Sequence, residues 1–228
     1  MRLFKIFALI AVSLWTFSIW TEYLNAQDNS QTQSPLSQNF WKWEAEGRLK
    51  LIDSILDDEY IAKARQDFHK TNLEILAAHL VELQTHAYGM PENFKTPSVY
   101  FTPLRGDANG VYMPMDQAIY INAKMQWASL NFERFIEVIL HENMHHILTF
   151  GHQAIGEGDM LFKDLELLRN VGLSPSDKNV MHRDLQEDVA YRAERAARYA
   201  GIMNAGLSAW DMSTRMQEIR VIKEDANR

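Results

Sequence analysis

The chain of 228 residues contains no cysteine, which excludes disulfide bonds, Cys-ligated zinc sites, iron–sulfur clusters and a thiol nucleophile. It also lacks a basic excess, because 30 acidic residues face 23 Lys and Arg and give a formal net charge of −7. Nucleic-acid-binding domains normally carry such an excess, so no nucleic-acid partner is expected. Hydrophobic residues make up 46% of the chain, and this composition predicts a folded globular core.

A hydrophobic run of full membrane-spanning length is also missing, although the N-terminus approaches one. Arg2 and Lys5 accompany an apolar run over 6–20. This run has the length of a signal-peptide core and falls short of the roughly 20 residues of a membrane-spanning helix. We therefore predict a signal peptide over 1–26 and an exported protein, periplasmic or secreted. The alternative is an uncleaved N-terminal membrane anchor. Residues 27–38 are rich in Gln, Ser and Asn and are predicted to form a flexible linker.

The rest of the chain, 39–228, is predicted to be one α+β domain, mostly helical with a small sheet of two to four strands beside the central helix. Hydrophobic periodicity predicts helices over 39–58, 61–86, 130–150, 161–170, 182–200 and 208–225. Strands are predicted over 98–102, 111–115 and 118–122. Pro114 makes the second of these an edge strand, and Gly151 is expected to end the helix over 130–150.

The most informative motif is His141-Glu142-Asn143-Met144-His145. Four residues are slightly more than one helical turn, so the two imidazoles lie one turn apart and only about 40° apart around the helix axis. Both can therefore reach one metal ion. Glu142 lies close enough to the same position to hold a water molecule and accept its proton.

The surrounding residues predict that this helix is buried, because apolar side chains occupy almost all of its faces. Two histidines and a glutamate are costly to bury without partners, and a metal ion removes that cost. Zn²⁺ accepts imidazole nitrogen and lowers the pKa of bound water to roughly 7. The motif thus predicts a zinc site with Glu142 as general base.

The motif resembles that of the zincin superfamily of zinc metallopeptidases, and more generally the chain resembles compact exported metallopeptidases of bacteria. The resemblance covers the strand over 118–122, the motif helix and a downstream helix, and its sharp part is the five-residue motif. It implies a zinc-dependent peptide-bond hydrolase with a peptide or protein substrate. It also suggests that the strand over 118–122 is an edge strand that pairs with an extended substrate.

The third metal ligand separates the branches of this superfamily. In metzincins a Gly and a His follow the first His at +7 and +10, positions occupied here by Leu148 and Gly151, so that branch does not fit. In gluzincins the third ligand is a Glu on a later helix. Glu187, followed by Ala190 and Tyr191, resembles the Glu-x-x-Ala-Tyr pattern of that helix and is the predicted third ligand. The alternatives are Asp188, Glu194, His182 and Asp159.

The sequence departs from the thermolysin-type pattern at one position. There an Asp four residues after the Glu orients a metal-bound His, whereas this chain has Tyr191. The candidates for the orienting role are Asp184, Asp188, Glu194 and a backbone carbonyl. Tyr191 itself is a candidate donor to an oxyanion, or a packing residue. His146 points about 100° away from His145 and is expected to be structural, with a role on the substrate side as the alternative.

Two other functions fit the same residues. One is an exported domain that binds metal through His141, His145 and Glu187 but catalyses nothing. The other is a helical interaction domain in which the histidine spacing is accidental. Loss of activity on substitution of Glu142 separates the enzyme from the first, and metal content separates it from the second.

Overall fold

The computed structural model describes the backbone of residues 36–106, 108–123, 132–172 and 180–203, and their side chains except those of 170–183, 197–199 and 201–203. Backbone contacts divide the chain into two units, 1–37 and 38–228. The described elements of the second unit are the α-helices α2 (Gln38–Asp57), α3 (Glu59–Gln66), α4 (Leu73–Ala87), α5 (Phe132–Ala154), α6 (Phe162–Gly172) and α7 (Val180–Met203), the 3-10 helix η1 (Phe68–Lys70), and the strands β1 (Ser98–Thr102), β2 (Gly110–Met113) and β3 (Ala118–Asn122). The α+β prediction, mostly helical with a small sheet, is confirmed.

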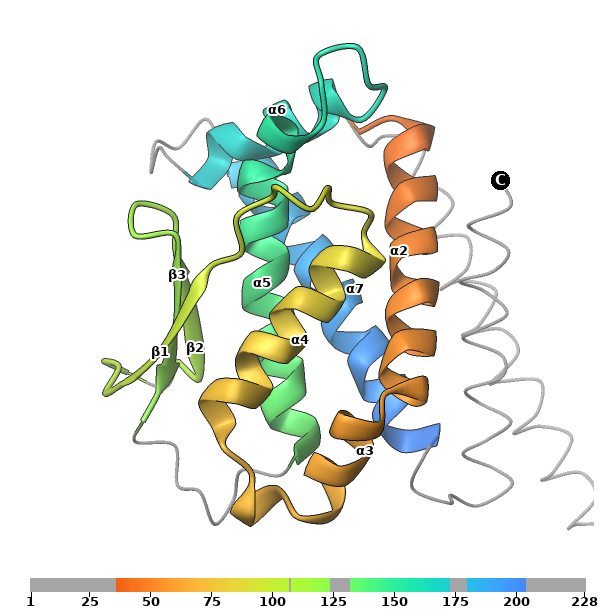
Figure 1. The fold of residues 1–228 in the computed structure, drawn as a ribbon. Helices are drawn as coiled ribbons and strands as arrows, with labels where there is room; N and C mark the ends of the chain where they lie inside the picture. Colours follow the sequence, from red (N-terminus) through yellow and green to blue (C-terminus); the bar gives the residue numbers. More distant parts are fainter. Residues whose placement is uncertain (1–35, 107, 124–131, 173–179, 204–228) are drawn as a thin grey trace, which may run out of the picture. The chain divides into compact units, whose positions relative to one another are not determined.

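Helix α5 carries the His141–His145 motif and lies at the centre of this unit. Figure 1 shows it between the small sheet on one side and α4, α7 and α2 on the other. Its apolar residues are buried on almost every face, among them Phe135, Ile139, Met144 and Leu148. The expectation of a buried central helix is therefore confirmed.

The sheet has three strands in the order β1-β3-β2, with β1 parallel and β2 antiparallel to β3. The expectation that Ala118–Asn122 is an edge strand is wrong, because β3 pairs on both sides. Four of its five residues are buried, as suits a central strand. The edge strand next to α5 is β2, as predicted, but it ends at Met113 and does not continue through Pro114 to 115.

The single helix predicted over 61–86 is instead two helices joined by η1. The side chain of Asn72 accepts hydrogen bonds from the backbone N–H groups of Glu74 and Ile75, and it thereby starts α4 as a separate helix. Asp58 caps α3 in the same way by accepting from Ile61. Phe68 is the one apolar residue between Gln66 and Leu73, so hydrophobic spacing does not mark where one helix ends and the next begins.

The motif helix was predicted to end at Gly151, but α5 continues to Ala154. A Cβ atom at Gly151 would lie 3.3 Å from Leu165 Cδ1, so the glycine lets α6 pack closely against α5. The signal peptide and the helix predicted over 208–225 fall outside the described residues. Among those that are described, no helix is long and apolar enough to cross a membrane.

A buried pair of amide side chains joins α4 to α5 behind the motif. Gln84 and Asn143 are both 0% exposed. Asn143 Nδ2 donates to Gln84 Oε1 at 2.9 Å, and Gln84 Nε2 donates to the carbonyl oxygen of Leu140 at 3.0 Å. Each amide therefore satisfies a polar atom of the other helix, which keeps α5 in a fixed position on α4.

This pair gives a stability prediction. Asn143→Leu and Gln84→Met are each expected to lower the free energy of unfolding by about 1–3 kcal/mol. Asn143→Leu leaves Gln84 Oε1 unsatisfied, and Gln84→Met leaves Asn143 Nδ2 with the weaker 3.3 Å bond to the carbonyl oxygen of Val81. The double variant is expected to lose less than the sum of the two, because no unpaired amide then remains. Urea unfolding of the four proteins measures this coupling. Strictly additive losses would show that the two amides do not stabilise each other.

Candidate metal centre

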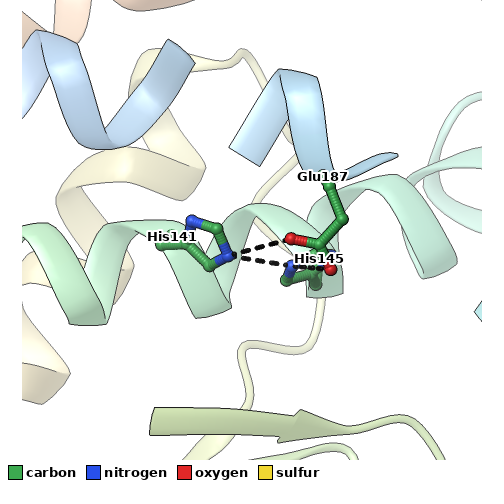
Figure 2. A group of neighbouring side chains, drawn as sticks. All are labelled: His141, His145 and Glu187. Atoms are coloured by element: carbon green, nitrogen blue, oxygen red, sulfur yellow. Dashed lines mark hydrogen bonds and ion pairs between the residues drawn. The ribbon is translucent and has the colours of Figure 1, made fainter. Parts of the chain in front are cut away.

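Three side chains predicted as metal ligands come together between α5 and α7. His141 and His145 extend from successive turns of α5, and Glu187 reaches them from α7 (Figure 2). The two Nε2 atoms are 3.2 Å apart, and the Glu187 carboxylate oxygens lie 3.5 Å from His141 Nε2 and 3.7 Å from His145 Nε2. One ligand atom from each residue lies within 4.8 Å of the other two. These residues therefore form a candidate metal-binding group.

The group is partly enclosed. The imidazoles of His141 and His145 are 13% and 12% exposed, whereas the side chain of Glu187 is 43% exposed. The histidines thus form the inner wall of the site, and Glu187 marks the side that solvent reaches. A ligand set that is enclosed on one side and open on the other leaves a coordination position for water or substrate.

A hydrogen-bonded chain fixes the orientation of His145. Thr149 Oγ1 donates to the carbonyl oxygen of His145, and its oxygen can in turn accept from Gln186 Nε2. This leaves Gln186 Oε1 to accept from His145 Nδ1 at 3.2 Å. Burial and the neighbouring His141 lower the pKa of His145 to about 4, so its imidazole is neutral. The proton therefore lies on Nδ1, and the lone pair of Nε2 faces the candidate site.

His141 lies between two carboxylates. Its Nε2 faces Glu187, and its Nδ1 lies 3.5 Å from Glu194 Oε2. Burial lowers the pKa of His141, but the carboxylates of Glu187 and Glu194 outweigh this and raise it to about 9. With no metal bound, a proton on Nε2 occupies the position between Glu187 and His145 Nε2. Two imidazole nitrogens and a carboxylate around one such position are a set that fits Zn²⁺.

Glu142 lies beside this group, where β2 approaches α5. The backbone N–H of Tyr112 donates to Glu142 Oε2 at 2.8 Å. The approach is close enough that a Cβ atom at Gly110 would lie 2.7 Å from Val138 Cγ1 and 3.1 Å from Glu142 Cγ. Burial raises the pKa of Glu142 to about 7. The carboxyl group is thus held in one place and is able both to accept and to release a proton near neutral pH.

Of the other predicted site residues, one lies at the ligand group and two do not. Tyr191 lies at the site, with its ring 4.8 Å from the ring of His141 and 53% of the residue exposed. Asp188 does not join the site, because its Oδ2 accepts from Arg192 Nε one turn further along α7. Asp159 accepts from the backbone N–H of Leu161, outside the group.

The remaining candidates for the third ligand or the orienting role are Glu194, Asp184 and His182. Glu194 faces the outer nitrogen of His141 and is absent from the ligand group. Asp184 is exposed, and the side chain of His182 lies outside the described residues.

His146 is structural, as expected. Its Nδ1 is 2.8 Å from the hydroxyl of Tyr112, and its Nε2 is 2.8 Å from the carbonyl oxygen of Lys95. Burial lowers the pKa of His146 to about 4, so a neutral imidazole can donate to the carbonyl and accept from the hydroxyl. The contact attaches β2 to α5, and in this way it helps to place the Tyr112 N–H against Glu142.

Three contributors were missed by sequence reasoning, namely Gln186, Tyr112 and Arg134, whose Nη1 donates to Glu194 Oε1 at 3.2 Å. Gln186 immediately precedes the predicted ligand Glu187, but a single Gln carries no signal for a role beside a metal. Arg134 contributes because α5 packs on α7, and Tyr112 contributes because β2 packs on α5. A local sequence pattern does not predict such contacts between distant elements.

Comparison with known proteins found no family model, no curated protein and no solved structure that matches this chain. What can be said of the site therefore follows from its own residues and geometry.

Proposed function

We propose that this protein is a zinc-dependent peptide-bond hydrolase that acts outside the cytoplasm. The observation that carries the proposal is the convergence of His141, His145 and Glu187 around one point. A proton acceptor, Glu142, adjoins this point against an edge strand. A non-catalytic metal site needs the three ligands but has no use for a buried carboxylate with a pKa near 7 beside them.

Zinc is the metal that suits this ligand set. Once His141 Nε2 has lost its proton, the two imidazoles and one carboxylate match the protein ligands of a recurring type of catalytic zinc site. Three protein ligands leave one position for water or substrate. When bound, zinc supplies Lewis-acid chemistry, which lowers the pKa of water to roughly 7 and polarises a carbonyl group.

Glu142 performs the proton transfers in this proposal. The Tyr112 N–H holds Oε2, which leaves Oε1 to accept a proton from the attacking water. The water oxygen forms a bond to the peptide carbonyl carbon, the C–N bond then breaks, and Glu142 gives the proton to the departing amine. The carboxylate is regenerated at the end of the cycle, and the products are a carboxylic acid and an amine.

The substrate is proposed to lie along the outer edge of β2 and not along β3. The Tyr112 N–H points away from β3 toward Glu142, so this edge faces the candidate site. An extended peptide added there would bring a carbonyl group between Glu142 and the ligand group. Tyr191, exposed beside His141, is the candidate donor to the developing oxyanion.

Peptide cleavage by the purified, zinc-loaded protein tests this function. A mixture of unstructured peptides, analysed by mass spectrometry, is expected to give new termini. Removal of zinc with a chelator is expected to abolish cleavage, and added zinc to restore it. If the wild-type protein binds one zinc but cleaves neither the peptides nor an unfolded protein, the non-catalytic metal-binding domain becomes the better account.

A further inference from the structure

We infer that Glu194, held by Arg134, is the positioning residue that fixes His141 for metal binding. The inference rests on the metal site of the proposed function. It adds a residue that neither the five-residue motif nor the Glu187 pattern contains.

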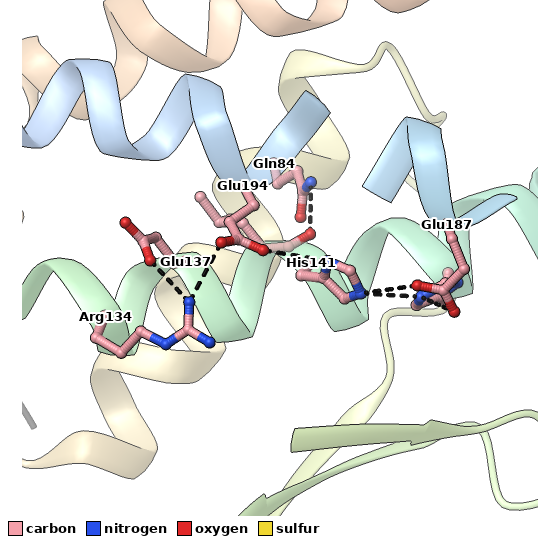
Figure 3. Close-up of polar contacts among 8 residues, drawn as sticks. Gln84, Arg134, Glu137, His141, Glu187 and Glu194 are labelled. Carbon is pink, nitrogen blue, oxygen red and sulfur yellow. Dashed lines mark hydrogen bonds and ion pairs between the residues drawn. The ribbon is translucent and has the colours of Figure 1, made fainter. Parts of the chain in front are cut away.

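Glu194 lies seven residues after Glu187 on α7, so both carboxylates extend from the same side of the helix toward α5. They meet opposite nitrogens of one imidazole. Glu187 Oε2 is 3.5 Å from His141 Nε2, and Glu194 Oε2 is 3.5 Å from His141 Nδ1. Figure 3 shows His141 between the two glutamates. His141 is thus contacted on its metal-facing side by one residue of α7 and on its outer side by another.

Arg134 compensates the buried charge of Glu194. The Glu194 side chain is only 12% exposed, and Arg134 Nη1 donates to its Oε1 at 3.2 Å. The same Nη1 donates to Glu137 Oε2 at 3.0 Å. A carboxylate so deeply placed is costly without a cation, and Arg134 supplies one. Because Arg134 binds Oε1, it leaves Oε2 turned toward His141.

His141 Nδ1 is buried and makes no well-formed hydrogen bond to the residues that the structure describes. Glu194 Oε2 faces this nitrogen at 3.5 Å, which is too long for a strong hydrogen bond. Binding of a cation at Nε2 makes Nδ1–H a stronger donor, so we expect this contact to shorten when metal binds. A carboxylate partner also makes the imidazole a stronger metal ligand. His145 has only the neutral Gln186 in the equivalent place.

The test compares Glu194→Gln with the matched control Glu137→Gln. Both residues are buried and both bind Arg134 Nη1, but Figure 3 shows the Glu137 carboxylate pointing away from His141. Zinc affinity is measured at pH 7 by competition with a chromophoric chelator. Glu194→Gln is expected to weaken zinc binding by about 10- to 100-fold, the usual effect of removing a group that orients a ligand. Glu137→Gln is expected to change it by much less.

A spectroscopic signature separates positioning from general stability. In wild-type protein loaded with zinc, the Nδ1 proton of His141 is expected to give a deshielded (downfield), slowly exchanging NMR signal that Glu194→Gln shifts or removes. Urea unfolding of both metal-free variants checks that each remains folded. Where Glu194→Gln lowers stability, Glu194→Asp, which keeps the charge, is expected to recover part of the zinc affinity.

The possible results distinguish the positioning role of Glu194 from the proposed hydrolase function. Equal zinc affinity for wild type and Glu194→Gln, or equal losses in the two Gln variants, would overturn the inference and leave the hydrolase proposal intact. Weaker zinc binding in Glu194→Gln alone, with no hydrolysis by any form, would support the inference and contradict the proposed enzyme. Absence of zinc binding by the wild-type protein would overturn both.

Discussion

Glu142→Gln is expected to lose about 10²- to 10⁴-fold in kcat/KM for peptide hydrolysis while it retains zinc, because general-base catalysis contributes on this order. The side chain keeps its shape, and an amide oxygen can still accept from the Tyr112 N–H that now holds Oε2. What disappears is the group that accepts and returns the proton. Steady-state hydrolysis of a peptide found in the cleavage screen, with zinc content measured on the same samples, tests this.

Glu133→Gln is the control for this variant, because Glu133 is an acidic residue of the same helix, at its first turn. It is expected to keep wild-type activity. If Glu142→Gln retained more than a tenth of the activity, the proton acceptor would lie elsewhere. Loss of zinc together with activity would indicate that Glu142 supports the metal site and not the proton transfer.

Glu187→Ala is expected to weaken zinc binding by more than about 100-fold, beyond the loss caused by removal of an orienting group. The variant removes the only carboxylate in the ligand group and leaves two imidazoles. Because the Glu187 side chain is 43% exposed, its removal leaves no large cavity, and the fold is expected to stay intact. Zinc affinity by chelator competition and the urea unfolding midpoint are the two measurements.

The neighbouring residue provides a close control for this second variant. Asp188 is also acidic, its side chain is 44% exposed, and it binds Arg192 on its own helix instead of the ligand group. Asp188→Ala is expected to keep wild-type zinc affinity. Equal losses in the two variants would point to a change in α7 as a whole, and an unchanged affinity in Glu187→Ala would assign the third ligand to another residue.

The helices were largely predictable because their apolar residues follow the helical period, and α2, α6 and α7 begin within two residues of the expected positions. The break between α3 and α4 was not predictable from periodicity, since it depends on the Asn72 cap competing with continuation of the helix. The strands were located, but their order was not. Pairing of β3 with both β1 and β2 is a tertiary choice that residue alternation does not encode.

The site shows the same division between local and long-range information. His141, Glu142 and His145 follow from spacing on one helix, which is a local property. Glu187 required a resemblance, because its distance from the motif is fixed only when α7 packs on α5.

The residue that orients His141 could not be chosen from the sequence. Glu194 was one of several candidates for this role, and the choice among them depends on which residues of α7 face His141. Sequence alone could not specify that rotation of the helix.

Zinc content of the wild-type protein, measured by elemental analysis after incubation with zinc and desalting at neutral pH, tests the central claim most directly. The variant His141→Ala/His145→Ala is measured beside it. We expect about one zinc per wild-type chain and none in the variant, because the variant removes two of the three ligands. A wild-type chain without zinc, or a variant that keeps it, would contradict the metal site and the function proposed from it.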